Sequence, residues 1–149
     1  MVFTLTSPAF AEGGRVPVRY TCDGDGLSPP LAWAHPPTAT IAFALVVDDP
    51  DAPGGVFTHW TLADIPGRAC ALAAGQTAGV AGTNDFPRIG YGGPCPPRSH
   101  GPHRYRFHVY ALAHELHLPH GFARTALDTA LRGAVLASAS ITASYERRR

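Results

Sequence analysis

Glycine and proline interrupt this sequence so often that long helices are not expected. The 149 residues include 16 glycines and 15 prolines, and both types are spread along the whole chain. Proline lacks the backbone N–H that a helix interior or a central strand uses, and glycine favours turns. The pattern therefore predicts many short elements joined by turns.

The apolar runs between these residues have the length and alternation of β-strands. Ile41 to Val47 is continuously apolar, which predicts a central strand buried on both faces. Tyr105 to Ala111 alternates strictly, so that its side chains fall on two distinct faces. Further strands are predicted at Val2 to Thr6, Val16 to Thr21, Phe57 to Leu62 and Leu136 to Tyr145.

Only one helix is predicted. The segment Thr125-Ala-Leu-Asp128 resembles a capping box, and Gly133 is a plausible stop. The apolar residues that would share one face of this helix are Leu127, Ala130 and Leu131. The Ala/Gly-rich segment from Asp64 to Gly82 is interpreted mainly as loop. Many strands and little helix predict an all-β fold, either an antiparallel sandwich or a barrel.

Length and composition favour one globular domain over residues 1–149. The formal net charge of +1 provides no basic field for nucleic acid. The first eight residues contain neither a cationic region nor a long apolar run, and no segment reaches transmembrane length. We therefore expect a cytoplasmic protein with no nucleic-acid partner and no transmembrane segment.

The three cysteines are few and odd in number, which favours a reduced, cytosolic chain. A bridge between Cys22 and Cys95 stays open as an alternative, because each lies beside a motif. No CxxC pair is present, so a cysteine zinc site is not indicated.

The first motif, Asp48-Asp49-Pro50-Asp51-Ala52-Pro53, ends the Ile41–Val47 run, and His59-Trp60 follows it. Aspartates beside proline either cap the local turn or serve a site. We favour the site for Asp49, the turn for Asp51, and a structural or exposed position for Asp48. A strand–turn–strand path could bring His59 back beside Asp49, where the carboxylate would orient the imidazole, although a lone histidine beside a tryptophan is more often a half-buried structural residue.

The second motif, Gly90 to Pro97, is followed by His103-Arg104-Tyr105. Glycines let a backbone approach a ligand closely, although an ordinary connector has the same composition. His103 and Tyr105 lie two residues apart on a strand, so they project to the same face and suit an anionic oxygen. Arg104 points the other way, as a structural ion-pair partner. The remaining histidines show no ligand spacing.

Together these segments resemble the phosphatidylethanolamine-binding protein family, which includes the Raf kinase inhibitor protein. The resemblance is closest to the short bacterial and archaeal branch. It also takes in Val16 to Gly24, Ser28-Pro-Pro-Leu-Ala-Trp33, Thr83-Asn-Asp-Phe86 and Gly101-Pro102. It implies an antiparallel Greek-key β-sandwich with a few peripheral helices, and a small pocket for phosphate-like anions.

Carried over by position, the resemblance assigns the pocket to six residues and places three more in support. The pocket residues are Asp49, His59, Gly93, Pro97, His103 and Tyr105, and the supporting residues are Asp51, Trp60 and Arg104.

The leading functional hypothesis is a binding protein for a small anion or a phospho-headgroup, without a cofactor or a metal. The alternative is an inhibitor that contacts a protease or a kinase, with the loop from Pro94 to Pro102 as a candidate contact. Catalysis is the least favoured hypothesis, because the sequence has no nucleophile elbow and no HExxH motif. A homodimer is plausible by family analogy.

Overall fold

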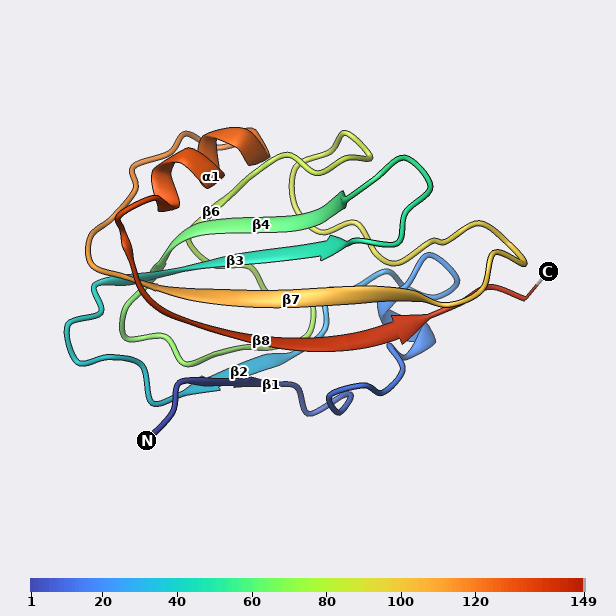
Figure 1. Cartoon of the computed structure of the whole chain (residues 1–149), viewed down its shortest axis with the longest axis horizontal. Helices are drawn as coiled ribbons and strands as arrows, with labels where there is room; N and C mark the ends of the chain where they lie inside the picture. The colour runs from blue at the N-terminus through green and yellow to red at the C-terminus, as the bar shows by residue number, and fades with distance from the viewer. Residues whose placement is uncertain (149) are drawn as a thin grey trace.

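The computed structural model describes residues 1–148 and contains two antiparallel sheets (Figure 1). The smaller sheet has the order β1-β2-β5, with strands Thr4–Thr6, Leu31–Ala34 and Ala71–Leu72. The larger sheet has the order β6-β4-β3-β7-β8, with strands Val80–Ala81, Phe57–Pro66, Ala42–Asp49, His103–Leu112 and Val135–Tyr145. The predicted antiparallel, mostly β architecture is confirmed.

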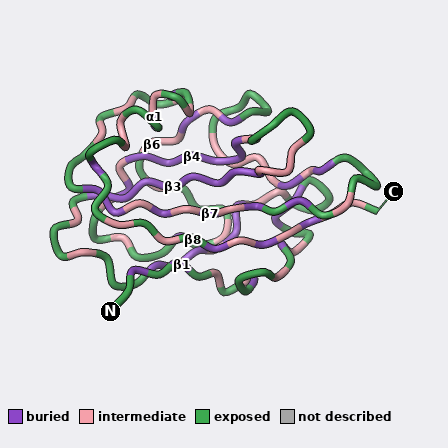
Figure 2. The backbone as a smooth tube through the Cα atoms, in the orientation of Figure 1, coloured by how far each residue is buried: buried purple, intermediate pink, exposed green. Residues whose placement is uncertain are grey.

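Strand β3 is buried along its whole length, as its continuous apolar run predicts (Figure 2). Phe43, Leu45 and Val47 belong to the main core, which also contains residues of the smaller sheet such as Trp33. Alternate residues such as Ala44 face the opposite way, under the helix α1 (Arg124–Leu131). Burial of each large apolar side chain contributes about 1.5–3 kcal/mol. The carboxyl end of β3 is consequently held in place from both sides.

The predicted strand at Val16 to Thr21 is wrong. Residues Val18–Tyr20 form a short 3-10 helix, η1. The carbonyl of Pro17 accepts the N–H of Tyr20, and the carbonyl of Val18 accepts both the N–H and the hydroxyl of Thr21. These local turn bonds satisfy the backbone without a partner strand, and they override the β-propensity of the side chains.

The other predicted strands are present with shifted ends, and the first is reduced to Thr4–Thr6. Strand β2 was not predicted, because four residues after a Pro-Pro pair carry little periodic signal. The Asp64 to Gly82 segment contributes the end of β4 and the two-residue strands β5 and β6, with the rest in turns and loops.

The single predicted helix is present, but its capping box is not. The helix begins at Arg124, Ala123 occupies the N-cap, and no side chain caps it. Thr125 therefore lies inside the first turn. Leu127 is the buried residue of the helix, and Gly133, with φ of 77°, lies just beyond its end as predicted. No helix in residues 1–148 has the length and apolarity needed to cross a membrane.

A disulfide joins Cys22 to Cys95, whereas Cys70 is free and exposed. The interpretation of a reduced chain is therefore wrong for this pair, and the alternative bridge is the one present. The backbone supports the same junction, because the N–H of Cys22 donates to the carbonyl of Pro94 at 3.1 Å. The disulfide ties the second motif to the segment that follows η1.

Candidate functional site

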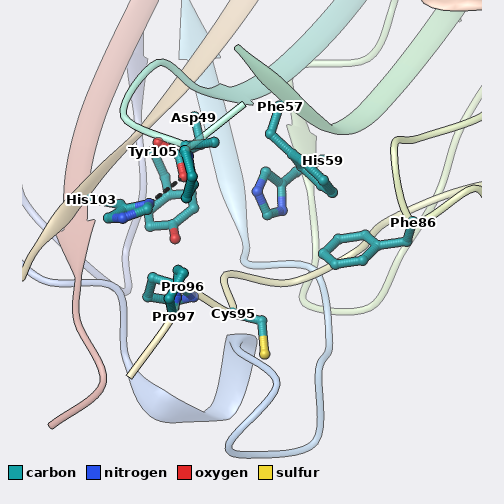
Figure 3. A pocket seen from close by; sticks show the side chains of 11 residues that line it. Asp49, Phe57, His59, Phe86, Cys95, Pro96, Pro97, His103 and Tyr105 are labelled. Atoms are coloured by element: carbon teal, nitrogen blue, oxygen red, sulfur yellow. Dashed lines mark hydrogen bonds and ion pairs between the residues drawn. The ribbon is translucent and has the colours of Figure 1, made fainter. Parts of the chain in front are cut away.

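The two motifs meet at one end of the larger sheet, around a cavity of about 130 Å³ (Figure 3). Strand β3 ends there, β4 and β7 begin there, and the loop after Cys95 closes the side. The polar residues that line the cavity are Asp49, His59, His103 and Tyr105. All four are at most 3% exposed.

Asp49 serves both roles that the sequence left open. Its Oδ1 accepts the backbone N–H of Asp51 at 2.7 Å and so caps the turn. Its Oδ2 accepts the Nδ1–H of His103 at 2.7 Å, in a pair that is almost completely buried. A carboxylate that is ionised can only accept, so this contact fixes the hydrogen of His103 on Nδ1.

The predicted pairing of Asp49 with His59 is wrong, although both residues line the cavity. The register places Asp49 opposite Phe57, so His59 lies two residues further along β4, while His103 begins β7 next to the end of β3. His59 instead donates from Nδ1 to the carbonyl of Gly92 at 2.6 Å. Burial is the largest influence on His59 and lowers its pKa, so the ring is neutral near pH 7.

Tyr105 lies on the same face as His103, as their spacing predicts, and its ring stands between the two histidines (Figure 3). The centroid of the Tyr105 ring lies 6.5 Å from that of the His103 ring and 5.2 Å from that of the His59 ring. The hydroxyl is buried and has no hydrogen-bond partner among the described residues. Burial, followed by the nearby Asp49 carboxylate, raises the pKa of Tyr105, so the group remains an O–H donor.

An apolar wall faces these polar groups. The rings of Phe57 and Phe86 meet edge to face at 4.8 Å, and both pack against His59. Pro97 lines the cavity as expected, together with Pro96 and Cys95. Gly92 is required here, because a Cβ at this position would lie 2.3 Å from the Phe86 ring. The two phenylalanines were not predicted, and the only signal for Phe86 was its place in a segment of the family resemblance.

Gly93 does not line this cavity, which corrects its expected position. A Cβ on Gly93 would lie 2.8 Å from the carbonyl oxygen of Tyr20, so the glycine allows the loop to pack on the chain after η1. Trp60 is also absent from the lining. It is buried in the core and packs edge to face on Tyr91 at 5.3 Å.

Arg104 forms an ion pair, as predicted, and its partner is Asp51, for which a cap of the local turn was expected instead. The guanidinium donates to both carboxylate oxygens, at 2.9 Å and 2.8 Å, and the Arg104 N–H adds a third bond. These hydrogen bonds lower the pKa of Asp51 to about 2. Neither residue lines the cavity, so the pair stabilises the turn beside it.

Asp48 lies on the opposite face of β3 from Asp49, since side chains alternate along a strand. It is 2% exposed and pairs with Arg106 at 2.9 Å and with Arg124 of α1 at 3.4 Å. Of the two predicted alternatives, structural or exposed, the structure shows the first. Asp48 does not line the cavity.

Among the described residues, one group of potential metal ligands lies near the end of β4 and just after β7, whereas the cavity lies where these strands begin. Ligand atoms of Asp64, Glu115 and His117 lie within 4.8 Å of one another. Both carboxylate oxygens of Asp64 already accept backbone N–H groups, from Leu116 and His117. The group is exposed or half-buried, and these bonds account for its geometry without a metal.

Comparison with known proteins places this geometry in a family. The family model described as phosphatidylethanolamine-binding protein matches residues 6–146. The chain is 44% identical to the UPF0098 protein of Aquifex aeolicus, over 98% of this chain and 90% of the relative. It is 41% identical to the "Putative lipoprotein LppC" of Mycobacterium tuberculosis, over 96% of this chain and 70% of the relative.

A solved structure gives the same result. The crystal structure of YbcL from E. coli, described as a new member of the mammalian PEBP family, superposes with a TM-score of 0.90. The two chains are 34% identical, and the match covers 98% of this chain and 99% of YbcL. The protein therefore belongs to the phosphatidylethanolamine-binding protein family. Within it, the chain falls in the prokaryotic branch that contains YbcL and the UPF0098 proteins.

Proposed function

We propose that the cavity binds a small phosphate-like anion or a phospho-headgroup. The observation that carries this proposal is the Tyr105 hydroxyl, a buried O–H without a partner among the described residues, in a cavity that two histidines share. A buried donor without an acceptor costs about 1–3 kcal/mol, and an anionic oxygen would recover that cost. Family membership supports the same class of ligand.

The two histidines complete the donor set when they are protonated. His103 keeps Nδ1 on Asp49, so a second proton would make Nε2 a donor that the carboxylate stabilises. His59 keeps Nδ1 on Gly92 and would gain a proton on Nε2. Anion binding is therefore coupled to proton uptake, and the affinity should rise as the pH falls below the ordinary histidine value of about 6.5.

Titration calorimetry with inorganic phosphate at about pH 5.5 and about pH 8 tests the proposal. We expect tighter binding at the lower pH, and a loss of about tenfold in Tyr105→Phe, which removes the hydroxyl and keeps the ring. Tyr110→Phe is the matched control, because Tyr110 lies on β7 outside the cavity. Equal affinity at both pH values, or an unchanged Tyr105→Phe protein, would contradict the proposal.

We further propose a binding function without catalysis. Among the described residues that line the cavity, Tyr105 carries the only hydroxyl, and its pKa is raised. Cys95 is the lining cysteine, and it is held in the disulfide. An acyl transfer through a hydroxyl or a thiol would need a better nucleophile than these two groups. Turnover of p-nitrophenyl phosphate or acetate that Tyr105→Phe abolishes would overturn this part.

A second candidate function is inhibition of a protease or a kinase. One observation favours it: residues 97–100 are exposed, while the loop that carries them is held at its base by the disulfide and by a bond from the Ser99 N–H to the Arg147 carbonyl at 2.7 Å. A rigid exposed loop binds a cleft at low entropic cost. Assays against a panel of serine proteases and kinases test this candidate, and uniform inactivity would reject it.

The disulfide also bears on where the protein works. A cytoplasmic location remains the prediction from the sequence, but stable disulfides are typical of oxidising compartments, and one relative is named a lipoprotein. We propose that the Cys22–Cys95 bond is formed in the working protein. Thiol titration of the unfolded protein without reductant should then find one thiol, Cys70, and three after reduction. Three thiols at the outset in protein isolated under acid quench would restore the reduced, cytoplasmic interpretation.

A further inference from the structure

A third imidazole, that of His100 in the loop before β7, contacts the cavity residue His103. The Nδ1 of His100 is 2.6 Å from the Nε2 of His103, and the two rings meet edge to face with centroids 4.9 Å apart. His100 is exposed, whereas His103 is 2% exposed. No role for His100 was predicted from the spacing of the histidines.

The direction of this hydrogen bond follows from the carboxylate on the other side of His103. Because Asp49 accepts the hydrogen on Nδ1, a neutral His103 has only a lone pair on Nε2. His100 must then donate its own Nδ1–H to that lone pair. The only nitrogen of His103 that remains for a ligand is thus already bonded to another part of the same chain.

An anion needs a hydrogen-bond donor at Nε2 of His103, whereas the neutral ring presents an acceptor there. Its oxygen accepts hydrogen bonds, so His103 has to present an N–H at Nε2, in the position that His100 now occupies. His100 and the anion cannot both use the single Nε2 site. The bond between the histidines therefore competes with anion binding.

We propose that His100 is an internal ligand of the cavity, which holds the Nε2 of His103 until an anion replaces it. This inference rests on the proposed anion binding and adds a residue to it. It also locates one oxygen of the bound anion, which takes the place of the His100 Nδ1 next to His103. The Tyr105 hydroxyl and His59 line the same cavity as His103 and are the donors that remain for the other oxygens (Figure 3).

The loop is built so that His100 can leave without disturbing β7. The backbone at and just before His100 is anchored, by the Ser99 N–H on the Arg147 carbonyl at 2.7 Å and by the His100 N–H on the Pro97 carbonyl at 3.2 Å. Ser99 and Gly101 both have positive φ, of 61° and 86°, so the chain makes a tight bend around His100. The exposed side chain can rotate into solvent while these anchors stay in place.

Calorimetry with inorganic phosphate on two variants of His100 tests the inference. His100→Ala removes the competitor, and we expect phosphate to bind about fivefold more tightly, which is the effect of one typical hydrogen bond. His100→Gln keeps a side-chain N–H that can donate to Nε2, and should stay close to the wild-type affinity. His114→Ala is the matched control, because His114 is exposed and its one side-chain bond within residues 1–148 is to the Glu115 carbonyl.

A second readout needs no ligand. In long-range ¹H–¹⁵N NMR spectra of the phosphate-free protein, the His103 Nε2 resonance should move in His100→Ala and stay in place in His114→Ala. Unchanged or weaker phosphate binding by His100→Ala, or an unmoved Nε2 resonance, would overturn the inference and leave the proposed function standing. Absence of phosphate binding in every variant, including wild type, would instead reject the proposed function and this inference together.

Discussion

Asp48 and Asp49 are consecutive residues at the end of one strand, and they are buried to the same extent, at 2% and 3% exposed. Their partners differ. Asp48 lies between the guanidinium groups of Arg106 and Arg124, which stay charged at every accessible pH. Asp49 bonds to the imidazole of His103, and an imidazole, unlike a guanidinium, has both a neutral and a charged form. The two aspartates thus differ in their partners and not in their burial. Asp48 pairs with groups of permanent charge, whereas the charge of the partner of Asp49 depends on protonation.

The largest effect on stability should come from removing the charge of Asp48. Asp48→Asn leaves two partly buried guanidinium groups facing a neutral amide, and we expect a loss of about 3 kcal/mol in the free energy of unfolding. Urea denaturation measures it. Phosphate affinity of the folded variant should stay within about twofold of wild type. A large loss of affinity with little loss of stability would reverse the roles assigned to the two aspartates.

The corresponding substitution in the Asp49–His103 pair is Asp49→Asn. The amide cannot stabilise a His103 imidazolium, so phosphate binding at about pH 5.5 should weaken by about tenfold or more. Its effect on the free energy of unfolding should be smaller than that of Asp48→Asn. The prediction fails if calorimetry finds the wild-type affinity in a correctly folded Asp49→Asn protein.

The pH dependence of stability tests the difference between the two faces of the larger sheet, because each face carries a buried or half-buried histidine. Burial is the main cause that lowers the pKa of both His59, in the cavity, and His108, beside Asp48. The unfolded chain therefore binds protons first as the pH falls below about 6.5, and the folded state loses stability in that range. His59→Gln and His108→Gln should each reduce this loss in urea denaturation between about pH 7 and pH 5. Only His59→Gln should also weaken phosphate binding, and an equal effect of both variants would contradict the difference between the faces.

The smallest effect should come from Asp51, the third aspartate of the motif. Its pair with Arg104 is open to solvent, with the arginine side chain 64% exposed, so Asp51→Asn should cost only about 0.5–1 kcal/mol at pH 7. Because the pair lowers the pKa of Asp51 to about 2, this contribution is present above the ordinary aspartate value of about 3.9 and is lost as the pH falls toward 2. Stability curves of the two proteins that stay parallel down to pH 2 would contradict it.

Much of the fold could be predicted because strands with a buried face carry their own pattern. The continuous run that became β3 and the strict alternation that became β7 predicted the two central strands. Strands of two to four residues, such as β2 and β5, have too few residues for a periodic signal. Nor could η1 be foreseen, because its local hydrogen bonds override the β-propensity of Val18 and Tyr20.

The polar residues that line the candidate site could be predicted, but the contacts between them could not. Spacing placed His103 and Tyr105 on one face, and the resemblance supplied the set. Which histidine meets Asp49 depends on the register between β3 and its two neighbours, and a sequence does not state that register. The contact of His100 with His103 depends on the bend of a loop, for which the sequence shows only a glycine and a proline.

The disulfide turns residues 22 to 95 into a covalent ring, while β7 and β8 lie on the tail that leaves it. The cavity is assembled across this division, because Asp49 and His59 belong to the ring and His103 and Tyr105 to the tail. A break in the backbone at the exposed Gly54-Gly55 turn would open the ring without separating the molecule into pieces. That turn is therefore a suitable place to insert a fluorescent reporter or to create new chain ends beside the cavity.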